Sequence, residues 1–243
     1  MSEVIWHDIE CGSYRQDLPL WLALAAEYAS PGAQILDVGA GTGRVSLTLA
    51  RAGHEVVALD TSRVLLAELA RRARGLPVET AQADARTFTL PGRSFPLIVV
   101  PMQTLQLLGG PEAHASFLLR ARQHLSPGGA VAVAIASMDD FEEFDAEQAE
   151  ALPLPDVAEI DGRAYFSQPT SIRREADAFV LERLREVVDQ HGERRSSVDR
   201  TRLDLLTPRR LETLAHAVDL QTRELRRIEP TDAHIGSEVV ILQ

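Results

Sequence analysis

The chain has no lysine, no asparagine and a single cysteine among its 243 residues, and each absence excludes a kind of chemistry. Without lysine there is no Schiff-base nucleophile, no lysine general base and no phosphate-loop lysine of the nucleotide-hydrolysing type. Because Cys11 stands alone, internal disulfides and thiolate metal clusters are excluded. All 25 basic residues are arginine, which we attribute to GC-rich codon usage rather than to function.

Positive charge is also scarce. The net charge of −11 argues against nucleic-acid binding, which needs a basic face to hold phosphates. The N-terminus carries Glu3, Asp8 and Glu10 and no basic segment that leads into an apolar run, so we expect no signal peptide. The apolar run Leu18–Ala26 contains Pro19 and is too short to span a bilayer. We therefore expect a cytoplasmic protein that does not bind membranes.

With 45% apolar residues, the chain can bury one sizeable α/β core. From residue 35 to about 136, apolar runs alternate with amphipathic stretches, which is typical of βαβ units around a parallel sheet. Runs such as Phe95–Val100 have no polar alternation, which predicts strands covered on both faces. The expected strands are Gln34–Val38, Glu55–Leu59, Val78–Ala81, Phe95–Val100 and Ala130–Ala136, followed by two near Thr222–Ile228 and Glu238–Leu242.

Helix signals lie between these runs. Thr61 or Ser62 can cap a helix that ends near Gly75. Near the C-terminus, Thr207 is a predicted cap and Pro208 occupies the first helical position.

Residues 137–206 follow a different pattern. An acidic, proline-marked stretch that includes Asp139 and Asp140 indicates an exposed connection. In residues 178–188 the apolar periodicity favours a helix, whereas the turn signal DQHGE and the β-branched stretch beyond it favour strands. We predict an antiparallel hairpin here.

The stretch ILDVGAGTGRV places glycines at 39, 41 and 43 between a predicted strand and a predicted helix. Glycines let the backbone turn tightly and approach a ligand, while the helix N-terminus presents free amides. The dinucleotide fingerprint would need glycine where this chain has Arg44. The loop therefore predicts a nucleoside-like ligand rather than a pyrophosphate.

Acidic residues follow the next two predicted strands. Asp60 ends the second strand roughly 20 residues after the loop, where a carboxylate can accept both ribose hydroxyls. Asp84 follows the third strand at the same sheet edge, where its side chain or the Ala85 amide can meet an adenine. Two such acids suit an adenosine that carries no phosphate and has a positive centre.

Together these segments resemble the class I S-adenosylmethionine-dependent methyltransferases. The resemblance rests on ILDVGAGTG, on Asp60 in VVALD, on QADA and on HLSPGGAVAV, and it covers residues 34–136 and the last strands. It implies an α/β fold with a Rossmann-like, seven-stranded, mostly parallel sheet, helices on both faces and an antiparallel strand insertion after the fifth strand. The implied cofactor is S-adenosyl-L-methionine.

The resemblance also assigns roles within the cofactor site. The glycine loop packs against the methionine part of the cofactor and Asp37 braces it from below, while Asp60 takes the ribose. Tyr14 either touches the methionine end or packs under the first helix, and the sequence does not decide between these. The implied cofactor-binding residues are Tyr14, Asp37, Gly39, Ala40, Gly41, Gly43, Asp60, Thr61, Asp84, Ala85, Pro101 and Met102.

The segment VPMQTLQLL after the fourth strand should face the acceptor. Enzymes that methylate amino groups of nucleic-acid bases or protein glutamine carry an Asn/Asp-Pro-Pro-aromatic tetrad here, and this chain has Val-Pro-Met-Gln. With the acidic charge, this predicts a small-molecule acceptor that Gln103 and Gln106 could bind, although Gln106 equally fits a polar helix start. Since no acid follows the fourth strand, we predict no metal.

The sequence identifies no catalytic residue. Methyl transfer from a sulfonium needs mainly alignment and exclusion of water, and a general base only for a protonated nucleophile. His7 and His234 flank segments that should form the site, and either could be such a base. A structural role is the commoner one for each.

By resemblance, the chain comprises a helical cap over the cofactor at 1–30, the cofactor-binding core at 31–136, an insertion that roofs the acceptor pocket at 137–206, and the last helix and strands at 207–243. The insertion resembles the strand insertion of sugar and glycine N-methyltransferases, which often makes a homodimer contact in those enzymes. The implied activity is metal-independent methylation of a nitrogen or oxygen. The alternatives are a cofactor-binding regulatory protein without catalysis and, less favoured, an aminopropyltransferase. Asp219 departs from relatives, which usually have glycine there.

Overall fold

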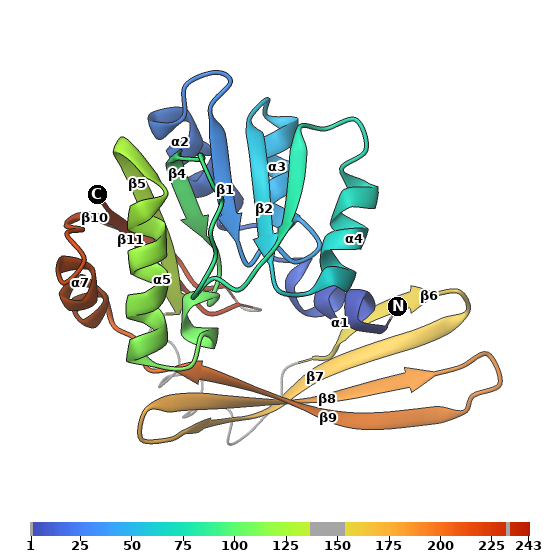
Figure 1. Ribbon diagram of the computed structural model, residues 1–243. Coiled ribbons are helices and arrows are strands. Elements are labelled where there is room, and N and C mark those ends of the chain that lie inside the picture. The colour runs from blue at the N-terminus through green and yellow to red at the C-terminus, as the bar shows by residue number, and fades with distance from the viewer. Residues whose placement is uncertain (1, 137–153, 232–233) are drawn as a thin grey trace.

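A seven-stranded sheet, here called the core sheet, forms the centre of the protein (Figure 1). The structure is a computed structural model that describes residues 2–136, 154–231 and 234–243, so Asp139 and Asp140 lie outside the described residues. The strand order is β10-β11-β5-β4-β1-β2-β3, in which β11 runs antiparallel to the other six strands. The strands are β1 (Gln34–Val38), β2 (Glu55–Asp60), β3 (Val78–Gln82), β4 (Phe95–Val100), β5 (Leu125–Ala136), β10 (Thr222–Ile228) and β11 (Ser237–Leu242). The predicted α/β fold is confirmed.

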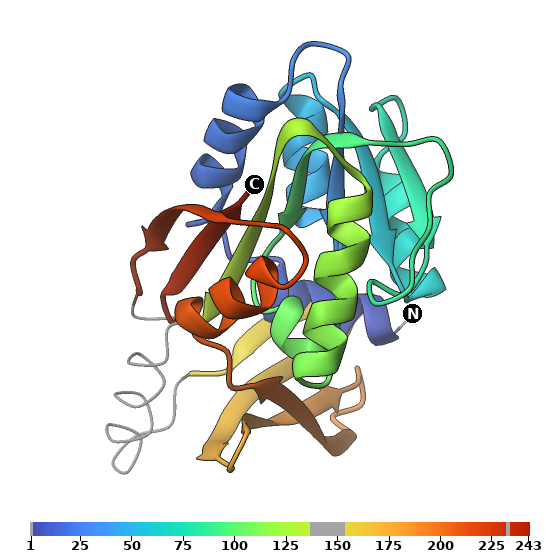
Figure 2. The same cartoon turned by 60° about the vertical axis from the view of Figure 1, so that its left-hand side comes forward.

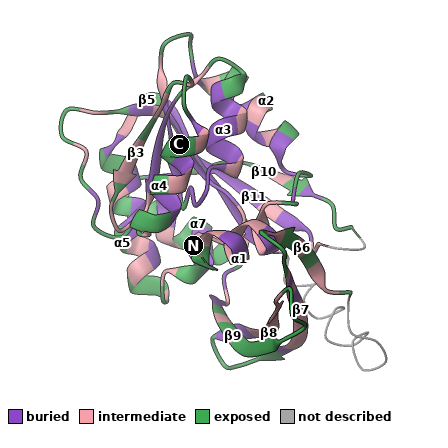
Figure 3. Ribbon diagram, turned by 90° about the vertical axis from the view of Figure 1, so that its right-hand side faces the viewer, coloured by how far each residue is buried: buried purple, intermediate pink, exposed green. Residues whose placement is uncertain are grey.

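Helices cover both faces of the core sheet, because successive side chains of each strand point to opposite faces. Ile35 of β1 packs in the cluster that holds α2 and α3, whereas its neighbour Leu36 packs in the cluster that holds α5 and α7. Most residues of β1, β4 and β11 are buried, whereas β3 and β10 at the two edges of the sheet are largely half-buried or exposed (Figure 3). The helices are α1 (Ser2–Cys11), α2 (Leu18–Tyr28), α3 (Arg44–Arg51), α4 (Arg63–Arg72), α5 (Pro111–Gln123) and α7 (Pro208–His216), with a 3-10 turn η1 (Leu105–Leu107).

Two predicted helix caps are present. The Ser62 side chain accepts a hydrogen bond from the Leu65 amide at the start of α4, and Thr207 accepts one from the Arg210 amide at the start of α7. None of the helices in the described part of the chain has the length and apolar character needed to cross a bilayer.

The insertion folds into a second, antiparallel sheet in the order β6-β7-β8-β9, which lies across one end of the core (Figures 1 and 2). Its strands are β6 (Asp156–Ile160), β7 (Arg163–Arg174), β8 (Ala178–Val188) and β9 (Arg194–Asp204). Residues 178–188 thus form a strand, and the predicted hairpin is confirmed. Pairing of β8 with both β7 and β9 prevails over the local helical periodicity, and Gly192 with φ +82° makes the turn.

The second sheet is fastened to the core where the chain leaves and re-enters it. The Gln106 amide of η1 donates to the Asp204 carbonyl (3.1 Å) and accepts from the Ala136 amide (2.7 Å). The buried Asp204 carboxylate accepts from the amides of Gly109 and Gly110 at the start of α5 and lies 3.1 Å from the His114 ring. The end of β5 and the end of β9 are therefore held together against η1 and α5.

Asp219 adopts a left-handed conformation (φ 59°) just after α7, where the Leu220 amide donates to the Ala215 carbonyl. We expect Asp219→Gly to raise the free energy of unfolding by roughly 0.5–1 kcal/mol, because glycine adopts this conformation without strain. Asp219→Ala is the control and should destabilise the protein, since alanine retains Cβ and loses the polar side chain. Urea unfolding measures both, and an Asp219→Gly variant less stable than the parent would contradict the explanation.

Candidate functional site

The carboxyl ends of β1 and β4 meet at the point where the strand order of the core sheet reverses. β1 pairs with β2 on one side and with β4 on the other, and open α/β sheets bind ligands outside such a switch point. The glycine loop leaves β1 here, and the segment 101–104 leaves β4 beside it. The chain connectivity alone therefore brings two of the predicted site segments together.

The glycine loop is held against the end of β2. The amides of Gly39 and Ala40 donate to the Leu59 carbonyl (2.8 and 3.1 Å). Gly39 and Gly41 have φ values of 74° and 55°, and a Cβ at Gly39 would lie 2.5 Å from the Thr104 hydroxyl. A Cβ at Gly41 would overlap the His7 ring. The loop therefore needs glycine both for its conformation and for the close approach of neighbouring groups.

Asp60 turns its carboxylate toward this loop. One oxygen accepts from the Gly41 amide (2.8 Å) and the other from the Ser62 amide (2.8 Å). An ionised carboxylate has about four acceptor positions, so two remain for the hydroxyls of a ribose. Asp60 ends β2 as predicted, and its contact with a ribose stays a prediction.

Asp37 lies fully buried beneath the loop. The Ser46 hydroxyl donates to one carboxylate oxygen (2.5 Å), while the other has no hydrogen-bond partner among the described residues. Burial raises the pKa of the Asp37 carboxyl to about 6, and the Ser46 hydrogen bond and the charge of Arg44 only partly oppose this. An unpartnered buried carboxylate oxygen fits a site for a cationic ligand.

The residues predicted beside the adenine lie nearer the surface. Asp84 is bound by the guanidinium and the amide of Arg86, and the hydrogen bonds to Arg86 lower the pKa of Asp84. Ala85 is buried in the core, and Thr61 is exposed with its carbonyl accepting from Gln82. Asp84 would have to release Arg86, or share it, to bind a ligand through its carboxylate.

After β4 the chain turns sharply at Met102, which has the left-handed φ of 54° that is uncommon outside glycine. Pro101 is buried, and Thr104 donates to its carbonyl (2.9 Å) while lying against Gly39. Gln103 is half-buried in this turn. The side-chain amide of Gln106, in contrast, is bound at both ends, to the backbone carbonyl of Asp204 and the backbone N–H of Ala136. Gln106 therefore has a structural role.

Tyr14 is held beside the loop by a buried ion pair. Arg44, directly after the loop, donates to both oxygens of Asp17 (2.5 and 2.7 Å) and to the Tyr14 carbonyl (2.9 Å). The Trp21 indole also donates to Asp17 (2.8 Å), and the Arg44 guanidinium lies over the Tyr14 ring. Burial first, and the nearby charge of Asp17 second, raise the pKa of Tyr14 to about 12, so its hydroxyl stays protonated.

Helix α1 supplies the predicted His7 and also Asp8, which the sequence did not indicate as a site residue. Asp8 accepts from the Thr42 hydroxyl of the loop (2.7 Å) and pairs with Arg72 of α4. The His7 ring lies 3.3 Å from the Thr42 hydroxyl, and burial lowers the pKa of His7. The acidic residues of α1 were visible in the sequence only as charge, because their partners are far along the chain.

His234, in the loop between β10 and β11, packs edge-on against Tyr14 with ring centroids 4.9 Å apart. Burial lowers the pKa of His234 below its ordinary value of 6.5. Of the two predicted histidines, His7 therefore lies over the glycine loop and His234 lies beside Tyr14. Both are neutral at pH 7, as a general base must be.

Comparison with known proteins shows which family the chain resembles. A family model described as a methyltransferase domain matches residues 35–129. The cypemycin N-terminal methyltransferase of a Streptomyces species is 36% identical over 99 residues, which are 41% of this chain and 40% of that protein. This chain therefore spans less than half of that relative's length in the match.

Two further likenesses extend over more of the chain. A carboxy-S-adenosyl-L-methionine synthase of Ectopseudomonas mendocina is 31% identical over 183 residues, 70% of each protein. The solved structure of the sugar N-methyltransferase KedS8 from a Streptoalloteichus species has a TM-score of 0.75 at 18% identity and covers 99% of this chain and 92% of its own. At this identity the structural likeness shows the fold alone.

The raised pKa of Asp37 makes binding of a cation depend on pH. Below about 6 the carboxyl is neutral, and a positively charged ligand favours its ionised form, so affinity should rise as pH increases through about 6 and binding should release a proton. Calorimetric titration of S-adenosylmethionine in buffers with different ionisation enthalpies measures this release.

Asp37→Asn is the matched control, because it keeps the acceptor for Ser46 and cannot ionise. It should lose the pH dependence of binding. In the unliganded protein the raised pKa favours folding at acidic pH, and this contribution is lost as pH rises through about 6, so Asp37→Asn should also be more stable than the parent at neutral pH. An unchanged pH dependence in Asp37→Asn would contradict the assignment.

Proposed function

Because the chain belongs to the class I S-adenosylmethionine-dependent methyltransferases, we propose that it transfers the methyl group of S-adenosylmethionine to a nitrogen or oxygen of a small-molecule acceptor. The observation that carries the proposal is the pairing of Asp60 with the Gly41 and Ser62 amides, which aims a carboxylate at the position of a ribose. The absence of a pyrophosphate loop, with Arg44 in place of the third glycine, supports the same ligand class.

The residues present fit this cofactor. The glycine loop admits close approach of a ligand, Asp60 has acceptor capacity left for hydroxyls, and the unpartnered oxygen of Asp37 lies under the loop. When bound, S-adenosylmethionine supplies a methyl group that its sulfonium has already activated. The chain then has to hold the acceptor in line and to keep water out.

We propose an amine as the acceptor group. One relative is named an N-terminal methyltransferase and one structural neighbour a sugar N-methyltransferase, while ubiquinone biosynthesis O-methyltransferases also match. An amine arrives largely as an ammonium at pH 7, and it must lose a proton before it can attack the methyl group. The second sheet and the Gln103 turn are the elements that face this nucleophile in our proposal.

His234 is the group we propose to take that proton. It is neutral because burial lowers its pKa, and it lies against Tyr14, which the buried Arg44 fixes beside the glycine loop. His7 is also neutral, but its ring lies over Gly41 and next to Thr42, on the cofactor side.

The similarity to carboxy-S-adenosyl-L-methionine synthases makes modification of the cofactor itself a second candidate. The two functions differ in their products. Methyl transfer leaves S-adenosylhomocysteine, whereas the synthase reaction leaves a carboxylated cofactor, and mass spectrometry of the reaction separates them.

Calorimetric titration of S-adenosylmethionine into the parent and into Asp60→Ala tests the proposal. We expect the parent to bind and Asp60→Ala to bind roughly tenfold to hundredfold more weakly, because it loses charge-assisted hydrogen bonds. Glu79→Ala, which removes a surface carboxylate paired with Arg93, is the control and should bind like the parent. Absence of S-adenosylmethionine binding to the parent would refute the proposal. If the parent binds S-adenosylmethionine but forms no S-adenosylhomocysteine with any of a panel of small amines, the protein is non-catalytic.

With an acceptor identified in that panel, the pH dependence of kcat tests His234. Activity should fall as pH decreases through the pKa of His234, and His234→Gln should lose most of its kcat, roughly 10²-fold or more, with little change in KM for the cofactor. His191→Gln, on the exposed turn of the second sheet, is the control. A kcat profile in His234→Gln identical to that of the parent would exclude His234 as the base.

A further inference from the structure

Two arginines two residues apart on β8 lie on the same face of the second sheet, and their surroundings differ. All three nitrogens of Arg185 are bound: Nε and Nη2 donate to the two oxygens of Glu10 in α1 (2.7 Å each), and Nη1 donates to Asp199 of β9 (2.7 Å). The Trp6 ring of α1 covers its guanidinium. Arg185 therefore joins α1 to the second sheet, and each of its three nitrogens already has a protein partner.

Arg183 is held far more loosely. Only Nη1 has partners, the Asp156 carboxylate at 3.2 Å and the Ser167 hydroxyl at 3.3 Å. The Ser167 hydroxyl gives its own proton to Glu10 (2.7 Å) and so acts as the acceptor here. Within the described residues, Nε and Nη2 have no partner, although the Arg183 side chain is only 17% exposed. Neither nitrogen is among the buried atoms that lack a partner, so both are open to solvent and free to donate to a bidentate anion.

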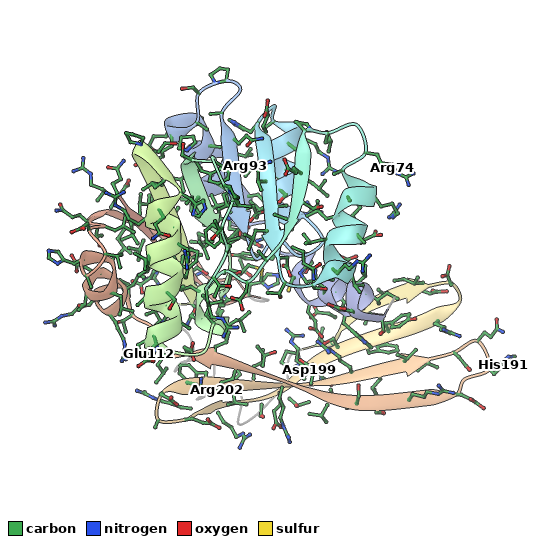
Figure 4. All side chains as sticks on the ribbon, viewed as in Figure 1. Arg74, Arg93, Glu112, His191, Asp199 and Arg202 are labelled. Carbon is green, nitrogen blue, oxygen red and sulfur yellow. The ribbon has the colours of Figure 1, made fainter. Side chains whose placement is uncertain are left out.

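The position of Arg183 links it to the proposed acceptor side. Its charge acts on His234, the proposed base, and on Cys11 at the end of α1. Ser167 and Glu10, its neighbours, belong to β7 and α1, so Arg183 lies between the second sheet and the core and not on the outer face. Figure 4 shows side chains from both sides reaching into this region, with Asp199 labelled on the second sheet.

We propose that Arg183 binds an anionic oxygen group, a carboxylate or a phosphate, of an acceptor whose amine is the nucleophile, which rests on the methyl transfer proposed above. The planar guanidinium presents two parallel donors through Nε and Nη2, the pair that recognises such groups. Asp156 holds the third nitrogen and orients the fork, and its negative charge also weakens binding of a second anion. The acceptor is thus an amine with an acidic group, not a neutral or purely cationic amine.

Three amines test this, each with two methylene carbons between the nitrogen and the varied group: β-alanine carries a carboxylate, O-phosphoethanolamine a phosphate and ethanolamine a neutral hydroxyl. Each amine is titrated into the protein alone and into the protein saturated with S-adenosylhomocysteine. The dissociation constant is obtained from the changes in NMR chemical shift. We expect at least one anionic amine to bind tenfold or more tightly than ethanolamine, and the stronger of the two identifies the source of the anion. Arg183→Gln should abolish this preference, because it should weaken binding of the anionic amine roughly tenfold to hundredfold.

Two further variants sharpen the result. Asp156→Asn removes the competing charge and should tighten binding of the anionic amine several-fold, the opposite direction to Arg183→Gln. Arg200→Gln removes an exposed arginine that pairs with Glu182 on the same sheet, and it should bind like the parent. Circular dichroism will check that each variant is folded. Arg183→Lys keeps the positive charge but loses the two parallel donors of the guanidinium, so it should retain only part of the preference.

Ethanolamine binding as tightly as both anionic amines, no binding of either anionic amine, or a preference that survives in Arg183→Gln would each overturn the proposal. The titration of S-adenosylhomocysteine itself reports separately on the proposed function. If that ligand fails to bind, methyl transfer is refuted, while the titrations into the protein alone still decide the role of Arg183.

Discussion

The ion pair between Arg44 and Asp17 is the contact on which the site depends. The two side chains are 9% and 1% exposed, and the bidentate pair is completed by the Trp21 indole and the Tyr14 carbonyl. Removing one partner of such a buried pair costs about 3–5 kcal/mol, because the other charge is left without compensation. Since Arg44 opens α3 directly after the glycine loop, the pair fixes the N-terminal segment and the loop relative to each other.

A second set of contacts joins this loop to the second sheet through α1. Asp8 binds Thr42 of the loop and Arg72 of α4, while Glu10 on the same helix binds Arg185 of β8. The His7 ring occupies the space over Gly41, so a ligand that packs on Gly41 meets this ring first. Because α1 contacts both the glycine loop and the second sheet, displacement of His7 would be transmitted to the side where we place the acceptor.

The sequence predicted the parts of this protein that local patterns determine. Strand positions, the caps Ser62 and Thr207 and the strand-end Asp60 follow from apolar runs, capping preferences and spacing, and the structure confirms them. Asp219, singled out as a departure from glycine, proves to need a left-handed conformation. Residues 178–188 have helical periodicity, but the turn signal DQHGE that follows them predicts a hairpin, and they form a strand.

Contacts between distant segments could not be predicted in this way. Gln106 fits either a ligand-binding or a structural role in sequence, and only its partners 30 and 98 residues away show that its amide is fully used. The same holds for His234 against Tyr14, for Arg72 with Asp8 and for the contrast between Arg183 and Arg185. Each of these depends on how the two sheets and α1 are placed in three dimensions, which no short pattern encodes.

The central claim is that the glycine loop, Asp60 and the Arg44–Asp17 pair form a binding site for an adenosine without phosphate. A crystal structure with S-adenosylhomocysteine bound would test this claim most directly. We predict ribose hydroxyls on Asp60, the His7 ring displaced from Gly41 and the Arg44–Asp17 contact unchanged. A ligand bound elsewhere, or an Asp60 side chain that makes no contact with the ribose, would contradict the account.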